Sequence, residues 1–370
     1  MLRIAVVLVM LGSIACCAPA PRELKIGVLA PLSTVGAPVQ EGLTLAIDEW
    51  NARGGVIGMK VVPLLRDTKG DPGSAAEAAR QVITKDKVHY IVGDIFSGLS
   101  IAISEVANPA KVVQVTPTST AEAVTVDVNG AAKGYVFRAC FIDPFQGRVG
   151  ATFAVKSLKA KRAFVMVDPN DVYVKGLAEA FMSSFTEDGG TVVGKEAYSP
   201  SDADFSKTLA LVKSSKADVV YLPAISLPAV NLATRQAKQK GIAATFMGGD
   251  GWDDLALDPA ASDGSYFTAQ FRADDPRPES QAFVKAYRGK YGGTPGMISA
   301  LTYDATNLLL AAIKDAGVDN TDKVKAALER IALDGVTGTI TMDAQHNPVK
   351  GAVVLHVTGG KVVFDSYASP

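Results

Sequence analysis

Short apolar runs alternate along the chain with stretches in which apolar residues recur at helical spacing. Such runs are typical of parallel strands that are joined by crossover helices, because these strands are buried on both faces. The alternation therefore predicts an α/β fold built from doubly wound parallel sheets. In the first part of the chain we expect strands at 24–30, 59–67, 89–93 and 111–115, and helices at 41–53, 74–85 and 99–107.

The same alternation starts again near residue 135, which predicts a second lobe. Its expected strands are 135–140, 162–167, 191–194, 218–222 and 245–248, and its expected helices are 144–158, 173–188, 204–214 and 228–240. A strand at 265–270 and helices at 280–291, 299–316 and 321–333 could cover either lobe, and strands 352–357 and 361–367 form a closing hairpin.

No low-complexity linker separates the two halves, which favours several chain crossovers in a hinge. We expect the first lobe to contain residues 23–138 and about 269–345. The second lobe should then contain residues 139–268 and about 346–370.

Two of the expected strands are followed by turns rich in hydroxyl groups. Ser97 follows the strand at 89–93, while Thr118, Ser119 and Thr120 follow the strand at 111–115. The carboxyl ends of parallel strands meet at one edge of a sheet, where ligands bind, and helix starts at this edge attract anions. These turns therefore suit a small carboxylate.

Taken alone, these residues are better explained by ordinary helix capping, because most helices need a cap. The segment 119–122 matches a capping box, in which a hydroxyl and a carboxylate satisfy backbone donors at a helix start. Ser97 could cap its own helix in a similar way. The presence of two such turns on neighbouring strands favours a ligand site.

Composition and charge bound the class of protein. The chain has 370 residues, enough for two domains, and its 48% apolar and 20% charged residues are typical of a folded globular protein. Its formal net charge is −1, and no basic surface is expected. Neither a nucleic acid nor electrostatic binding to an anionic membrane is predicted as a consequence.

The N-terminus has the pattern of an export signal. Arg3 precedes an apolar run at 4–14 that is too short to cross a bilayer as a helix. The run ends in a sequence that resembles a bacterial lipobox, and we expect residues 1–15 to be a lipoprotein signal peptide with Cys16 as the lipidated residue. Cys17 is the alternative, and a cut after 18–20 would release the protein unlipidated. The protein is then extracytoplasmic, in the periplasm or at the cell surface, and touches the membrane only through its lipid anchor.

Cysteine and histidine usage gives no catalytic or metal site. Cys140 is the one cysteine of the expected folded region, so neither an internal disulfide nor a metal framework is predicted, and no cofactor is expected. Residues 189–196 approach a P-loop but end on Glu196 instead of serine or threonine. The three histidines show no spacing of a triad. We therefore expect a protein that is not an enzyme.

From about residue 24 to its C-terminus the chain resembles type I periplasmic solute-binding proteins, specifically the leucine/isoleucine/valine-binding family that delivers amino acids to ABC importers. The motifs that carry the resemblance are the segments 26–33, 51–58, 67–72, 91–93, 115–120, 137–138 and 146–147. The resemblance implies two lobes that close on a small molecule, with an ABC transporter permease as the partner.

The family's carboxylate-binding groups fall on the two hydroxyl turns. By resemblance, Ser97 holds the ligand carboxylate, and the next turn supplies a backbone group, a neighbouring residue and a threonine hydroxyl at Thr118, Ser119 and Thr120. This implication favours the ligand interpretation over simple capping.

The family's remaining ligand groups fall in the second half of the chain. Tyr173 takes the place of a tyrosine that covers the bound amino acid, and Asp250 takes the place of the acid that binds the ammonium, where glutamate is commoner. Trp252 could line the pocket or pack in the hinge. Asp250 could instead be a turn-forming residue, and Tyr173 could simply begin a helix.

The chain departs from the family where the ligand side chain is expected. Val35 stands near a position that often holds tryptophan, Ser226 or Leu227 replaces a tyrosine, and Phe96 replaces a cysteine of a small disulfide. The ligand is therefore expected to be an amino acid, branched-chain or related. Aromatic or small polar amino acids, short amides and aromatic acids remain alternatives, as does a ligand-sensing receptor domain of the same fold.

Overall fold

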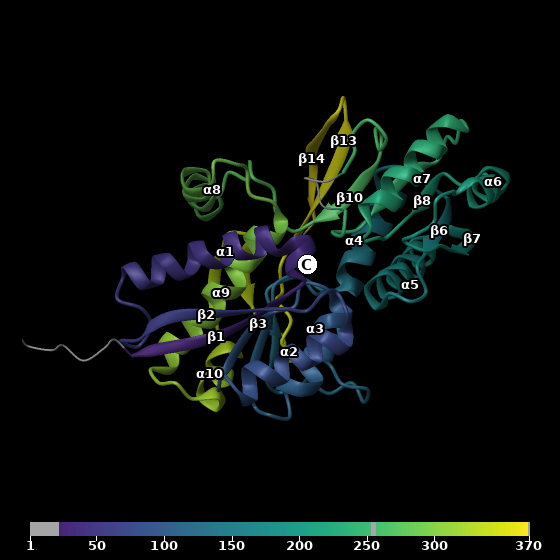
Figure 1. Ribbon diagram of the computed structural model, residues 1–370. Helices are drawn as coiled ribbons and strands as arrows, with labels where there is room; N and C mark the ends of the chain where they lie inside the picture. Colours follow the sequence, from purple (N-terminus) through teal and green to yellow (C-terminus); the bar gives the residue numbers. More distant parts are fainter. Residues whose placement is uncertain (1–21, 253–256, 369–370) are drawn as a thin grey trace, which may run out of the picture.

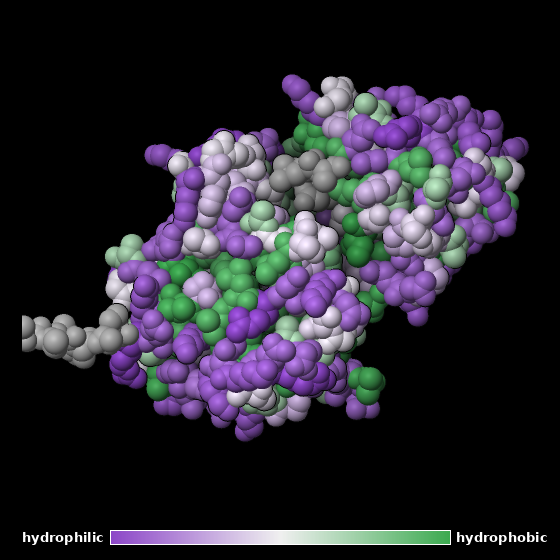
Figure 2. Space-filling model, viewed as in Figure 1, coloured by the Kyte–Doolittle hydropathy of each residue, from purple (hydrophilic) through white to green (hydrophobic). Residues whose placement is uncertain are grey.

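The computed structural model describes residues 22–252 and 257–368, which form two α/β lobes (Figure 1). The expected two-lobed architecture is confirmed, and the expected signal peptide and Cys16 lie outside the described residues. Hydrophilic residues cover most of the outer surface of both lobes in the space-filling view (Figure 2). Among the described residues, no helix is sufficiently long and apolar to span a bilayer.

The first lobe is built on a five-stranded parallel sheet with the order β2-β1-β3-β4-β5. Its strands are β1 (Glu23–Ala30), β2 (Lys60–Asp67), β3 (Tyr90–Gly93), β4 (Val113–Thr116) and β5 (Val136–Arg138). The helices α1 (Leu32–Ala52), α2 (Pro72–Thr84), α3 (Ser97–Ala107), α8 (Pro278–Tyr291), α9 (Met297–Ala316) and α10 (Thr321–Leu328) belong to this lobe. The sheet, α1, α9 and α10 share one apolar core, in which β3 and β4 are buried along their whole length.

The second lobe is built on a seven-stranded sheet with the order β14-β13-β10-β9-β8-β6-β7. Its strands are β6 (Arg162–Val167), β7 (Thr191–Ala197), β8 (Val219–Tyr221), β9 (Thr245–Gly248), β10 (Tyr266–Ala269), β13 (Ala352–Thr358) and β14 (Lys361–Ala368). The predicted hairpin β13–β14 adds to this sheet in antiparallel orientation, because β13 pairs with β10. Its helices are α4 (Asp143–Lys156), α5 (Val172–Glu187), α6 (Ser206–Ser215) and α7 (Leu227–Gln239).

Close packing of α4 against α5 fixes the part of the second lobe that faces the first. A Cβ atom added to Gly147 would lie 2.5 Å from the Cβ of Ala180 and 2.7 Å from the nitrogen of Phe181. Only glycine allows this approach. Since Gln146 lies on α4 and Tyr173 on α5, the contact sets the distance between two side chains that both donate hydrogen bonds to Asp250.

The chain passes between the lobes after β5, after β10 and again before β13, in agreement with the expected hinge of several crossovers. Three local predictions were wrong. The strand expected at 135–140 as the first of the second lobe is β5, which pairs with β4 in the sheet of the first lobe. α1 begins at Leu32 instead of residue 41, with a kink at Val35. The expected helix at 321–333 ends at Leu328, and β11 (Ala332–Gly335) then pairs with β12 (Gly338–Thr341).

The β11–β12 hairpin depends on a contact that is distant in sequence. The buried carboxylate of Asp304 on α9 accepts hydrogen bonds from the backbone N–H groups of Val336 and Thr337 at 2.8 and 2.9 Å. This contact fixes the turn between the two strands. The spacing of apolar residues around residue 330 does not reveal this contact, which explains why the prediction was wrong.

Candidate functional site

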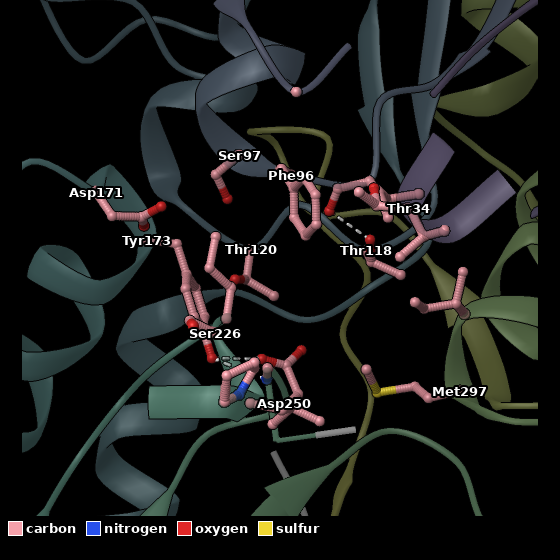
Figure 3. A pocket seen from close by; sticks show the side chains of 18 residues that line it. Thr34, Phe96, Ser97, Thr118, Thr120, Asp171, Tyr173, Ser226, Asp250 and Met297 are labelled. Atoms are coloured by element: carbon pink, nitrogen blue, oxygen red, sulfur yellow. Dashed lines mark hydrogen bonds between the residues drawn. The ribbon is translucent and has the colours of Figure 1, made fainter. Parts of the chain in front are cut away.

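A cavity of about 550 Å³ lies between the two lobes. The first lobe contributes the starts of α1, α3 and α9 and the turn after β4, while the second contributes the turns after β8 and β9 and the start of α5 (Figure 3). The lining residues are Thr34, Val35, Gly70, Ile95, Phe96, Ser97, Thr118, Thr120, Asp171, Tyr173, Ile225, Ser226, Leu227, Pro228, Asp250, Gly251, Met297 and Ile298. Among these described residues there is no lysine, arginine or histidine, and the acids are Asp171 and Asp250.

Asp94 organises the wall of the first lobe from behind. It follows β3 and is fully buried; its carboxylate accepts hydrogen bonds from the Thr68 hydroxyl at 2.7 Å and the Ile95 N–H at 2.6 Å. Its carbonyl accepts the hydroxyls of Ser100 and Thr116 at 2.9 and 2.5 Å. Burial raises the pKa of Asp94 to about 7, and the Thr68 hydroxyl lowers it. This network fixes the turn that leads into α3.

Ser97 is the first residue of α3 and lines the cavity. Its hydroxyl oxygen accepts a hydrogen bond from the backbone N–H of Ala121 at 3.2 Å, so its own proton can be donated into the cavity. The helix cap is Phe96, which makes no side-chain hydrogen bond. The capping interpretation of Ser97 is therefore wrong.

The second hydroxyl turn divides its three side chains between different tasks. Thr120 lines the cavity, and Thr118 lines it while donating its hydroxyl proton to the Ile95 carbonyl at 2.6 Å. Ser119 is fully buried and exchanges a hydrogen bond with Ser100 at 2.7 Å, so its side chain does not reach the cavity. The predicted capping box is absent here, because the short helix at 122–124 begins after Ala121 without a side-chain cap.

Asp250 is the polar centre of the second wall and is only 5% exposed. One carboxylate oxygen accepts hydrogen bonds from Gln146 Nε2 and the Tyr173 hydroxyl, both at 3.0 Å, and the other accepts one from Gln270 Nε2 at 2.8 Å. Burial raises the pKa of Asp250, and these three donors lower it. The carboxylate is thus held in place and still borders the cavity.

Two further acids lie in this wall or close behind it. Asp171 lines the cavity and caps α5 by accepting the Val174 N–H at 2.9 Å; burial raises its pKa. Asp143, at the start of α4, is buried, and neither of its carboxylate oxygens makes a hydrogen bond of good geometry within the described residues. Burial raises the pKa of Asp143 well above its ordinary value, and the nearby Thr120 hydroxyl lowers it. A raised pKa favours the neutral acid, so Asp250, whose carboxylate is held by three donors, is the group of this wall best suited to meet an ammonium.

Tyr173 connects the carboxylate to the backbone that carries it. Its hydroxyl donates to Asp250 and accepts the Gly251 N–H at 3.1 Å (Figure 3). Tyr173 therefore lines the cavity, as expected, and also orients the acid.

Trp252 does not form part of the pocket wall, which was one of the two positions expected for it. The side chain is fully buried in the second lobe, its indole N–H donates to the Leu222 carbonyl at 2.9 Å, and its ring lies 6.2 Å from that of Phe267. The turn at 248–251 leaves room for the ring only because Gly248 has no side chain. Trp252 consequently supports the turn that carries Asp250 and does not line the cavity.

The positions that depart from the family pattern all line the cavity. Val35, Phe96, Ser226 and Leu227 form part of a largely apolar wall together with Ile95, Ile225, Met297 and Ile298. Sequence reasoning missed Thr34, Asp171, Met297 and Ile298 as lining residues. Asp171 could have been found from its cap position before Tyr173, whereas Met297 and Ile298 reach the site only through the chain crossover before α9.

No group of three or more potential metal ligands occurs within residues 22–252 and 257–368. Cys140 is free and buried, and burial raises the pKa of its thiol to about 12. The described site therefore offers donors and acceptors for a small polar molecule and an apolar wall beside them.

Comparison with known proteins gives one consistent result. A family model described as periplasmic binding protein matches residues 23–361. A Leu/Ile/Val-binding protein, BraC3 from Rhizobium johnstonii, is 34% identical over 329 residues, which cover 86% of this chain and 87% of the relative.

Two crystal structures have the same fold. The leucine-binding protein LivK from Thermotoga maritima is 35% identical with a TM-score of 0.86, and the match covers 94% of this chain and 99% of that one. The substrate-binding protein LivJ of a branched-chain amino acid transporter from Streptococcus pneumoniae, in complex with isoleucine, is 29% identical with a TM-score of 0.84 and covers the same shares.

Proposed function

Because the chain belongs to the periplasmic binding protein family, together with the Leu/Ile/Val-binding proteins, we propose that it captures an amino acid between its lobes and delivers it to an ABC importer. Proteins of this family bind solutes for transporters and are not enzymes, in agreement with the expectation from the sequence. The observation that carries the proposal is the opposition of hydroxyl donors on one wall to Asp250 on the other.

The two walls suit the two charged ends of an amino acid. In the proposal, the Ser97 hydroxyl, with its proton free, and Thr120 bind the carboxylate, while Asp250 binds the ammonium. Each charge-assisted hydrogen bond contributes about 1.5–3 kcal/mol net. Four or five of them support micromolar binding, about −8 kcal/mol, after the costs of ordering are subtracted.

The apolar wall supports an amino acid with an apolar side chain, branched-chain or related. Val35, Phe96, Leu227, Met297 and Ile298 would contact this side chain. Apart from Phe96, these residues have no aromatic ring. The cavity of about 550 Å³ therefore has room for a ligand side chain of moderate size.

Delivery requires that the loaded state be recognisable. Because Ser97 and Thr120 belong to one lobe and Tyr173 and Asp250 to the other, a ligand completes its contacts only when the lobes are closed, and it therefore favours that state. A permease would recognise the closed pair of lobes. The protein would act outside the cytoplasm, tethered by a lipid on Cys16.

Calorimetric titration tests the proposal. Purified protein is unfolded and refolded to remove resident ligand and is then titrated with each standard amino acid, with benzoate and with acetamide. Micromolar binding of leucine, isoleucine or valine is expected. Binding of benzoate or acetamide alone would replace the amino acid with an aromatic acid or a short amide, and no binding to any amino acid would overturn the assignment.

A further inference from the structure

A buried arginine lies directly behind the wall that faces the ligand carboxylate. Arg138 ends β5 and has no exposed surface. Its Nη1 donates to the Ser119 carbonyl at 2.7 Å, and its Nη2 donates to the Ala121 carbonyl at 2.9 Å and to the Thr125 hydroxyl at 3.0 Å. The guanidinium thus holds the carbonyls on both sides of Thr120.

No carboxylate forms a salt bridge with Arg138 within the described residues, and Asp143 and Asp343 act on its charge only from a greater distance. The groups in contact with it are neutral carbonyls, the Thr125 hydroxyl and the Cys140 thiol, and its Nε has no partner among the described residues. A guanidinium keeps its proton in proteins, and a buried cation is costly unless an anion or oriented dipoles compensate it. A simple scaffold role would be filled at lower cost by a neutral side chain.

The contacts also determine which way the peptide groups of this turn point. In a trans peptide the N–H lies opposite the C=O, and the Ser119–Thr120 bond is trans, since the cis bond of the described chain is Gly93–Asp94. The Ser119 carbonyl points at Arg138, so the N–H of Thr120 points away from Arg138, and Thr120 itself is a residue that lines the cavity.

We propose that Arg138 is a positioning residue that makes the pocket select a negatively charged carboxylate. Arg138 orients the Thr120 N–H toward the carboxylate and polarises the peptide group to which this N–H belongs. It also places a positive charge behind the cavity wall, which contains no basic side chain among its described residues. The inference rests on the proposed function, because it assigns a carboxylate to this end of the cavity.

The test compares leucine with leucinamide, which keeps the ammonium and the side chain but has no negative charge. Calorimetry gives the ratio of the two affinities for the wild type, Arg138→Met and Arg138→Lys. We expect Arg138→Met to lower the ratio at least about tenfold, mainly through weaker leucine binding, and Arg138→Lys to restore part of it. A general loss of structure would weaken both ligands alike and leave the ratio unchanged.

Lys350 provides the matched control. It is another buried cation, whose Nζ donates to the Ala139 carbonyl at 3.2 Å and to the Thr337 hydroxyl, away from the carbonyls beside Thr120. Lys350→Met should leave the ratio within about twofold of the wild type, as expected for a charge that does not act on the turn. An equal fall in both variants would overturn a specific role of Arg138.

Variants of Thr125 provide the test if neither Arg138 variant folds. Thr125→Val removes an acceptor of the guanidinium, and Thr125→Ser keeps it. The ratio should fall about two- to threefold in Thr125→Val and remain unchanged in Thr125→Ser. An unchanged ratio in Thr125→Val would overturn the inference. A wild type that binds neither probe would instead overturn the proposed function.

Discussion

Asp94 and Asp250 occupy corresponding places in the two lobes and perform different tasks. Each follows a glycine just beyond a parallel strand, each is buried, and the carboxylate of each accepts three hydrogen bonds from its own surroundings. Asp250 lines the cavity, whereas Asp94 lies behind the wall. A residue's type and its place after a strand therefore do not decide whether it meets the ligand.

The difference follows from the donors that surround each carboxylate. Two of the three donors to Asp94 are the backbone N–H groups of Ile95 and Phe96, which turn its carboxylate back into the loop. All three donors to Asp250 are side chains from other elements, and they leave part of it at the cavity surface. The first wall consequently offers neutral donors to an anion, and the second offers a charge to a cation.

The largest expected effect concerns the free energy of unfolding and Asp94. Its pKa is raised from 3.8 to about 7 by burial, so the folded state binds a proton that the unfolded state releases between these values. Stability from this group is complete below about pH 4 and is lost as the pH rises through about 7, by about 4 kcal/mol in total. Asp94→Asn should remove this fall, as measured by urea denaturation between pH 4 and pH 8.

Ligand affinity gives the control for this variant. Asp94 does not line the cavity, so leucine should bind Asp94→Asn within a few-fold of the wild type at pH 5, where both side chains are largely neutral. Parallel stability profiles of variant and wild type would show that Asp94 has no raised pKa.

The second prediction concerns Asp250 and the affinity for the ligand. Asp250→Asn removes the negative charge that the proposal assigns to the ligand ammonium and places an amide N–H₂ among Gln146, Tyr173 and Gln270, all of which donate. We expect calorimetry to show leucine affinity lower by about 2 kcal/mol or more, at least about 30-fold. A ligand without the amino group, 4-methylpentanoate, should bind variant and wild type with more similar affinities. Undiminished leucine binding would make Asp250 a structural residue.

The contrast between the aspartates shows how far sequence reasoning reached. Apolar runs and helical spacing predicted the strands of both sheets, and the hydroxyl turns after β3 and β4 pointed to Ser97 and Thr120, because these signals are local. The sequence could not separate Ser119 from Thr120. Ser119 is drawn inward by Ser100, 19 residues earlier in the chain, and this contact is set by packing.

Other misses have the same cause. The sequence allowed Trp252 to line the cavity or to pack in the hinge, whereas the ring lies in the core of the second lobe, where the Leu222 carbonyl and the lack of a side chain at Gly248 fix its place. Met297 and Ile298 line the cavity at the start of a helix that follows a crossover between the lobes. Spacing along the chain describes the neighbours of a residue in its own element, whereas these positions depend on neighbours from elsewhere.

The third prediction compares a hydroxyl in each of the two turns, Ser97 after β3 and Ser119 after β4. Ser97→Ala removes the hydroxyl that lines the cavity and should lower leucine affinity by about 1–2 kcal/mol, or about tenfold, because a charge-assisted hydrogen bond is lost. Ser119→Ala is the matched control, since its hydroxyl contacts Ser100 and not the cavity. Its leucine affinity should stay within about twofold of the wild type. Equal losses in the two variants would mean that both turns act only as a scaffold.

The smallest expected effect on leucine affinity comes from a variant that changes the orientation of Asp250 and leaves its charge in place. Tyr173→Phe removes one of three donors to the carboxylate and leaves the Gly251 N–H without its acceptor, while Gln146 and Gln270 still hold Asp250. Leucine affinity should fall by about 0.5–1 kcal/mol, or about threefold. Tyr221→Phe is the control, because the Tyr221 hydroxyl is buried without a partner among the described residues, and its removal should leave affinity unchanged and stability equal or higher. If Tyr173→Phe instead matched the loss in Asp250→Asn, the hydroxyl itself would contact the ligand, and the second wall would act through two groups.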